Sequence, residues 1–127
     1  MNPLRDAAEA ARSRAYAPYS GFRVGAALET SAGTIVMGCN VENASYGLTM
    51  CAERNALAAA VAAGHTVFRR LALVSDAPEP ISPCGTCRQV LHEFGGDLII
   101  ESWAGSEVRR WTVAELLPAA FSRDLLT

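Results

Sequence analysis

Apolar positions along this chain follow two different spacings. Residues 3–15 carry apolar side chains three and four positions apart, which is typical of an amphipathic helix. Asn2 is suited to cap this helix and Pro3 to begin it. Residues 22–28 alternate weakly and residues 35–39 form a short apolar run, with a Ser-Ala-Gly turn between them. This second pattern predicts a β-hairpin.

Helical and extended patterns then alternate to the end of the chain. Residues 51–63 are rich in Ala and Leu and are followed by Gly64, which predicts the strongest helix of the chain. Residues 71–74 are almost wholly apolar, as expected of a strand that is covered on both faces. Such alternation predicts an α/β fold with one mixed sheet and helices packed on it. The remaining expected elements are a helix at 84–93, strands at 97–102 and 107–111, and a final helix at 113–117 that Thr112 would cap.

Length and composition limit the classes of protein that this chain can form. With 127 residues, we expect residues 1–127 to form a single domain. Hydrophobic residues make up 50% of the chain, which is enough for a buried core. The formal net charge is −2, so no strong attraction to nucleic acid is expected. All 11 basic residues are Arg, and the absence of Lys excludes Schiff-base or P-loop lysine chemistry.

The start of the chain bears on the state of its four cysteines. Residues 1–15 contain no apolar run long enough for a signal peptide or a membrane span, so we expect a cytoplasmic location. In a reducing compartment cysteines serve more readily as metal ligands or catalytic groups than as disulfides. The cysteines are Cys39, Cys51, Cys84 and Cys87.

Three of these thiols form a pattern that is suited to metal binding. Cys84 and Cys87 have the C-x-x-C spacing, and together with Cys51 they could reach one tetrahedral zinc ion. Both predicted helices begin with a cysteine, where the positive helix end favours thiolate. Three protein ligands leave a fourth position for water, which is typical of a catalytic zinc site. Glu53 is not needed as a ligand and is well placed to act as the base for that water.

Three sequence blocks together resemble the small, zinc-dependent cytidine deaminases that act on free nucleosides. The blocks are Asn40-Val41-Glu42-Asn43, Cys51-Ala52-Glu53-Arg54-Asn55 and Pro83-Cys84-Gly85-Thr86-Cys87-Arg88-Gln89. The resemblance extends from residues 16–20 to residues 116–121. It implies a three-layer α/β/α fold around a mixed, mostly five-stranded sheet. It also implies one Zn²⁺ per chain and hydrolysis of cytidine and deoxycytidine to uridine and deoxyuridine with release of ammonia, a step of pyrimidine salvage.

The resemblance also implies residues that bind the nucleoside. In extended chain Asn40 and Glu42 face the same way, and the resemblance implies that this amide and carboxylate hold the two hydroxyls of a ribose, with a solvated strand end as the alternative. Phe22 would pack on the pyrimidine, although a core position is the alternative. Tyr46 could line the sugar pocket or merely pack. Main-chain groups of Ala52 and Cys84 could hold the base.

Two further residues have roles that only the resemblance implies. Arg54 would offset the negative charge of three thiolates on Zn²⁺, with a surface salt bridge as the alternative. Phe121 would reach into the site of a neighbouring subunit in a homotetramer, with packing in its own chain as the alternative. The expected partners are a small nucleoside and further copies of the chain, with neither nucleic acid nor membrane.

Several other interpretations remain open from the sequence alone. The C-x-x-C pair could be a redox pair, although this leaves Cys51-Ala52-Glu53 unexplained. Cys39 could be a fourth ligand and close a structural zinc site, but it lies in an apolar strand, where a free thiol is ordinary. Free cytosine, a nucleoside antibiotic and a polynucleotide are alternative substrates for the same metal blocks. The two histidines, His65 and His92, are expected to be structural or exposed to solvent.

Overall fold

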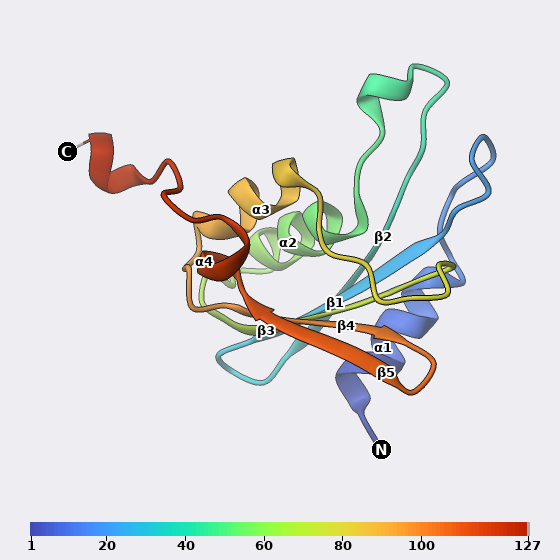
Figure 1. The fold of residues 1–127 in the computed structure, drawn as a ribbon, viewed down its shortest axis with the longest axis horizontal. Helices are drawn as coiled ribbons and strands as arrows, with labels where there is room; N and C mark the ends of the chain where they lie inside the picture. The colour runs from blue at the N-terminus through green and yellow to red at the C-terminus, as the bar shows by residue number, and fades with distance from the viewer. Residues whose placement is uncertain (127) are drawn as a thin grey trace.

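The computed structural model describes residues 1–126, and its centre is a five-stranded mixed sheet (Figure 1). The strand order is β2-β1-β3-β4-β5. Strand β1 is antiparallel to β2 and β3, β3 is parallel to β4, and β5 is antiparallel to β4. The strands are β1 (Val24–Thr30), β2 (Ile35–Cys39), β3 (Phe68–Ser75), β4 (Ile99–Ala104) and β5 (Glu107–Thr112).

Helices cover both faces of this sheet. Helix α1 packs on β1, β2 and β3 from one side, whereas α2 packs on β1 and β2 from the other and contacts α3 (Figure 1). The predicted three-layer α/β/α fold with a mixed five-stranded sheet is therefore confirmed. None of the helices among residues 1–126 is long and apolar enough to cross a membrane. The helices are α1 (Pro3–Arg12), α2 (Ala52–Ala62), α3 (Gly85–His92) and α4 (Val113–Leu116), with 3₁₀ turns η1 (Tyr46–Leu48) and η2 (Arg123–Leu126).

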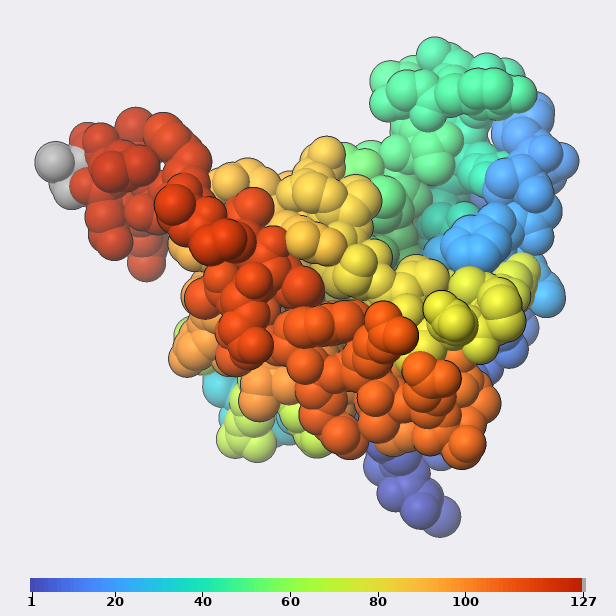
Figure 2. Space-filling view, in the orientation of Figure 1, coloured from blue at the N-terminus to red at the C-terminus, as the bar shows by residue number. Residues whose placement is uncertain are grey.

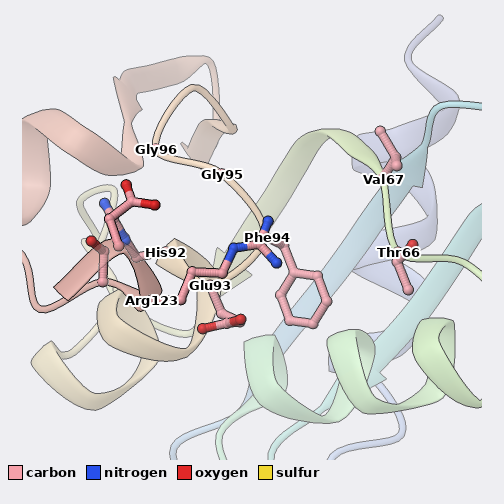
Figure 3. Close-up of a pocket in the computed structure, with 10 residues that line it drawn as sticks. Thr66, Val67, His92, Glu93, Phe94, Gly95, Gly96 and Arg123 are labelled. Atoms are coloured by element: carbon pink, nitrogen blue, oxygen red, sulfur yellow. The ribbon is translucent and has the colours of Figure 1, made fainter. Parts of the chain in front are cut away.

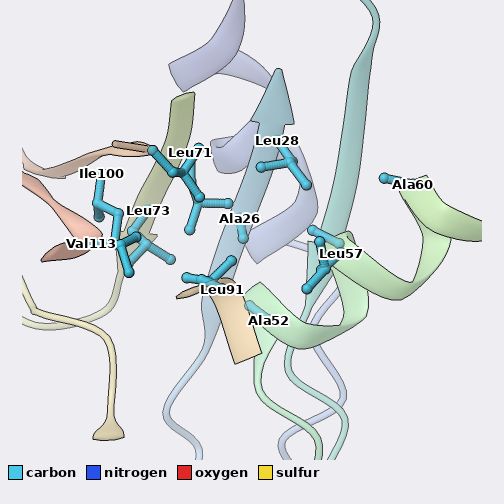
Figure 4. Close-up of a cluster of buried hydrophobic side chains, with 12 residues drawn as sticks. Ala26, Leu28, Ala52, Leu57, Ala60, Leu71, Leu73, Leu91, Ile100 and Val113 are labelled. Atoms are coloured by element: carbon cyan, nitrogen blue, oxygen red, sulfur yellow. The ribbon is translucent and has the colours of Figure 1, made fainter. Parts of the chain in front are cut away.

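Two apolar clusters, one on each face, hold the layers together. The larger cluster joins Leu57 of α2 and Leu91 of α3 to Leu73 and Ile100 of the sheet (Figure 4). Full burial of such a side chain contributes about 1.5–3 kcal/mol. The smaller cluster lies under α1 and comprises Leu4, Ala8, Ala27, Ala72 and Val74.

The first predicted elements are confirmed in kind, but their boundaries differ. Asn2 caps α1 as predicted, because its Oδ1 accepts from the Arg5 N–H at 3.1 Å. The helix ends at Arg12 instead of residue 15, because the following segment turns so that the Tyr16 N–H can donate to the Asn40 carbonyl. The hairpin of β1 and β2 forms as expected, although β1 begins at Val24 and not at residue 22.

Strand β2 and helix α2 are in direct backbone contact at Gly38. A Cβ atom at this position would lie 2.3 Å from the Ala56 nitrogen and 2.5 Å from the Ala52 oxygen. Only glycine therefore allows α2 to approach β2 this closely. The close approach fixes the position of α2 on the sheet, and this helix begins at Ala52, between Cys51 and Glu53.

We expect Gly38→Ala to lower the free energy of unfolding by about 1–3 kcal/mol, the usual cost of overpacking a tight site. Urea denaturation followed by circular dichroism measures this change. Gly47→Ala is the matched control, because nothing lies within 4 Å of a Cβ atom there. Its effect should stay within about 0.5 kcal/mol. Equal stability of the two variants would contradict the backbone contact.

Candidate active site

The sulfur atoms of Cys51, Cys84 and Cys87 lie within 4.8 Å of one another. The Cys51 and Cys84 sulfurs are 4.0 Å apart, and all three thiols are free. A tetrahedral zinc ion with Zn–S bonds of about 2.3 Å places its sulfurs about 3.8 Å apart, whereas a disulfide needs about 2 Å. The donor set and its spacing therefore fit zinc and do not fit a disulfide.

Two helix N-termini bring these sulfurs together. Cys51 is the N-cap of α2 and Cys84 is the N-cap of α3, both with extended backbone. The sequence predicted that each helix begins with its cysteine, whereas each helix begins one residue later. Neither thiol accepts a capping hydrogen bond, so both sulfurs are free to face the shared site. Cys87 lies one turn along α3 and is fully buried.

Arg54 and the neighbouring thiols stabilise a thiolate at Cys51. The hydrogen bond with Cys87 is the main cause that lowers the pKa of Cys51, to about 5; burial opposes it, and Arg54 adds to it. The Arg54 Nη2 lies 3.8 Å from the Cys51 sulfur and 3.3 Å from the Thr49 carbonyl oxygen. The structure therefore places Arg54 beside the sulfurs, where its charge offsets that of the thiolates.

Glu53 lies in the first turn of α2 and is only 5% exposed. Burial is the main cause that raises the pKa of its carboxyl group, and the charge of Cys51 raises it further. A buried carboxyl group with a raised pKa can both accept and donate a proton near neutral pH. Its position beside the sulfurs supports a role in proton transfer.

Glu42 lines a cavity of about 320 Å³ together with Tyr19, Ser20, Tyr46 and Thr49. Its carboxylate accepts hydrogen bonds from the Tyr19 N–H at 2.9 Å and from the N–H and hydroxyl of Ser20. The Ser20 hydroxyl is the main cause that lowers the pKa of Glu42. Glu42 thus presents a carboxylate to the cavity and also holds the turn that contains Tyr19 and Ser20.

Asn40 is buried and spans the gap between β2 and the segment before β1. Its Oδ1 accepts from the Val24 N–H and its Nδ2 donates to the Phe22 carbonyl, both at 2.8 Å. The sequence suggested an amide free to bind a ligand and did not indicate these two main-chain bonds. Phe22 is 40% exposed and Tyr46 is 75% exposed, so neither is a core residue of the single chain.

Some residues near the site had no role in the sequence interpretation. The Asn55 side chain donates to the Cys39 carbonyl at 2.8 Å and ties α2 to the end of β2. Arg88 binds the main-chain oxygens of nearby Pro83 and distant Leu116, and Gln89 binds that of distant Phe121. Their position within the cysteine block could have marked Arg88 and Gln89 as residues near the site. Their hydrogen-bond acceptors could not be predicted, because bonds to distant carbonyls leave no pattern in the sequence. The thiol of Cys39 is not part of the sulfur cluster formed by described residues.

The C-terminal segment projects from the body of the chain (Figures 1 and 2). Between it and the end of α3 lies a cavity of about 690 Å³, lined in part by His92, Glu93, Phe94 and Arg123 (Figure 3). None of the sulfurs lines this cavity. Phe121 is 58% exposed, and its carbonyl accepts from the Gln89 side chain at 2.8 Å.

Known proteins resemble this chain over nearly its whole length. Residues 3–101 match the family described as the cytidine and deoxycytidylate deaminase zinc-binding region. The cytidine deaminase of Sporosarcina psychrophila is 49% identical over 92% of this chain and 88% of its own length. That of Mycobacterium tuberculosis H37Rv is 46% identical over 97% of this chain and 90% of its own length. The crystal structure of the cytidine deaminase from Burkholderia pseudomallei superposes with a TM-score of 0.91 at 50% identity, covering 95% of this chain and 100% of that chain.

We expect the wild-type chain to retain one zinc ion through dialysis against a weak chelator, as measured by elemental analysis. Cys84→Ser should lose it, because a hydroxyl is a far poorer ligand than a thiolate. Cys39→Ser is the matched control and should keep the metal, because Cys39 lies outside the cluster. Loss of zinc from both variants would favour the closed four-cysteine site.

Proposed function

The chain belongs to the cytidine and deoxycytidylate deaminase family, and on this premise we propose that it is a hydrolase that converts cytidine and deoxycytidine to uridine and deoxyuridine with release of ammonia. The convergence of three thiols with the buried carboxyl group of Glu53 is the observation that carries this proposal. The relatives named cytidine deaminase that match at 46–49% identity support the same reaction.

Cys51, Cys84 and Cys87 would hold the metal. A zinc ion bound by these residues would supply Lewis-acid activation of a water molecule. Three thiolates carry more negative charge than Zn²⁺ neutralises, and this excess would make the water harder to deprotonate. The Arg54 guanidinium, 3.8 Å from the Cys51 sulfur, offsets part of this charge.

Glu53 moves the protons of the reaction. Its carboxylate accepts a proton from the attacking water and passes it to ring atom N3, while the water oxygen bonds to C4. Glu53 then takes the second proton from the oxygen that is now bonded to C4 and donates it to the amino group; the C4–N bond breaks as the C4=O double bond forms, and ammonia leaves. Water and cytidine are thereby converted to uridine and ammonia, and Glu53 returns to its first protonation state. Burial, which raises the pKa of Glu53, suits both transfers.

Groups around the two helix starts bind the nucleoside. The main-chain N–H groups of Ala52 and Cys84 lie at helix starts, where they have no intrahelical acceptor and can bind polar atoms of the base. Phe22 packs on the pyrimidine ring, and Asn40 with Glu42 holds the ribose beside Tyr46. The shared cavity of Glu42 and Tyr46 supports the sugar site.

Assembly, location and physiological setting are also part of the proposal. The outer face of α2 and its C-cap carry exposed apolar residues without charge, namely Ala58, Ala59, Val61, Ala62 and the C-cap Ala63. Such a face favours contact between chains. We propose a cytoplasmic homotetramer in pyrimidine salvage, folded as a single domain over residues 1–127, in which Phe121 enters a neighbouring subunit's site.

We expect Glu53→Gln to keep its zinc and to lose about 10³-fold or more in kcat, because both proton transfers depend on one carboxyl group. The loss of ultraviolet absorbance by cytidine and the release of ammonia measure turnover. Glu107→Gln, at an exposed carboxylate of β5, is the control and should keep wild-type activity. Near-normal turnover by Glu53→Gln would reject its role as the proton carrier.

We expect Phe121→Ala to weaken the tetramer and to raise the KM for cytidine about tenfold, which corresponds to about 1.4 kcal/mol. Light scattering and steady-state kinetics measure the two effects. Ser122→Ala changes the neighbouring residue and should alter neither. A Phe121→Ala variant that remains tetrameric with an unchanged KM would show that this side chain packs in its own chain.

A further inference from the structure

Arg88 lies where the turn that carries Cys84 meets the C-terminal segment. Its guanidinium donates from Nε to the Pro83 carbonyl at 2.7 Å and from Nη1 to the Leu116 carbonyl at 2.8 Å. A third bond, from Nη2, reaches the Ser82 hydroxyl at 3.1 Å. All three acceptors are neutral oxygens. The planar fork of a guanidinium can serve three such acceptors at once, which a lysine ammonium at the same place cannot do in the same geometry.

The bond to the Pro83 carbonyl fixes the orientation of Cys84. The Pro83 carbonyl and the Cys84 N–H belong to one planar trans peptide unit, so they point in opposite directions. The main-chain N–H of Arg88 also donates to the Cys84 carbonyl at 3.0 Å. Arg88 therefore holds the carbonyls on both sides of the Cys84 Cα atom. The Cys84 N–H itself has no hydrogen-bond acceptor among residues 1–126, which leaves it available to a ligand.

The bond to Leu116 reaches the end of α4. The carbonyl groups in the last turn of a helix have no partner within that helix, and Arg88 supplies one here. The next residue, Gln89, holds the Phe121 carbonyl five positions further along the chain. The two residues that follow Cys87 thus anchor the segment that carries Phe121.

We propose that Arg88 is a positioning residue that couples the Cys84 turn to the C-terminal segment. It fixes the direction in which the Cys84 thiol and N–H face the site, and through Leu116 it links that turn to the segment that carries Phe121. The kinetic consequences rest on the proposed deaminase function, whereas the consequences for metal binding do not. Without Arg88 the Pro83–Cys84 peptide loses the hydrogen bond that orients it. The metal would then be held less firmly, and the Cys84 N–H would no longer have a fixed direction toward the site.

The test compares Arg88→Lys and Arg88→Ala with two other variants of the full chain. Arg14→Lys makes the same exchange at an exposed arginine, and Gln89→Ala loosens Phe121 without touching the Pro83–Cys84 peptide. The measurements are the rate of zinc release to a chelator, the absorption bands of the Co²⁺-substituted protein, and kcat and KM for cytidine.

Both Arg88 variants should release zinc about 10- to 100-fold faster than wild type, as expected when a residue that orients a metal ligand is lost. Their Co²⁺ bands should shift, because the angle of the Cys84 sulfur changes, and kcat should fall. Gln89→Ala should raise only KM, with zinc release and Co²⁺ bands as in wild type. Arg14→Lys should match wild type in every measurement.

Wild-type zinc release and unchanged Co²⁺ bands in Arg88→Lys would overturn the proposal, whatever its activity. A KM effect alone, as in Gln89→Ala, would also overturn it, because the metal turn would then not depend on Arg88. If Arg88→Ala fails to fold, Arg88→Lys decides alone. If the wild type does not deaminate cytidine but Arg88→Lys still releases zinc faster, the proposed function fails and the positioning role is supported.

Discussion

The site depends on two helices, distant in sequence, that begin at the same point in space. Cys51 and Cys84 precede α2 and α3, and their sulfurs are 4.0 Å apart. A shift of either helix along its axis by one residue, about 1.5 Å, would take the sulfurs out of tetrahedral spacing. Backbone contact at Gly38 fixes α2 on the sheet, and the bonds of Arg88 fix the turn before α3.

Much of this arrangement follows from patterns that the sequence displays. The C-x-x-C spacing and the alternation of apolar runs are local patterns, and they indicated the Cys84–Cys87 pair of ligands and an α/β fold with one mixed sheet. The three-layer arrangement and the completed catalytic site with Cys51 rested on the resemblance to the deaminases, because they depend on contacts between distant segments. Helix boundaries were less accurate, since Cys51 and Cys84 proved to be N-caps. The hydrogen bonds of Asn40 to Phe22 and Val24 could not be predicted, because they join main-chain atoms of segments whose contact exists only in the folded chain.

Arginine performs two distinct tasks beside the sulfur cluster. Arg54 acts through its charge, close to the Cys51 sulfur, whereas Arg88 acts through the geometry of its fork on neutral carbonyls. The first task would survive replacement by another cation, but the second requires donors in one plane. Because all basic residues of this chain are arginine, the residue type does not separate these two roles. The groups that each guanidinium contacts do separate them: a thiolate indicates charge compensation, and neutral carbonyls indicate the orientation of a peptide.

The exposure of Cys84 has a practical consequence for handling the protein. Cys84 is exposed and its sulfur lies next to a second thiol, so the pair needs only a further approach of about 2 Å to form a bond between the sulfurs. Bound metal occupies the sulfur lone pairs and protects them from oxidants. A preparation stripped of zinc in air would therefore oxidise, and it would recover activity only when a reductant is added before the metal.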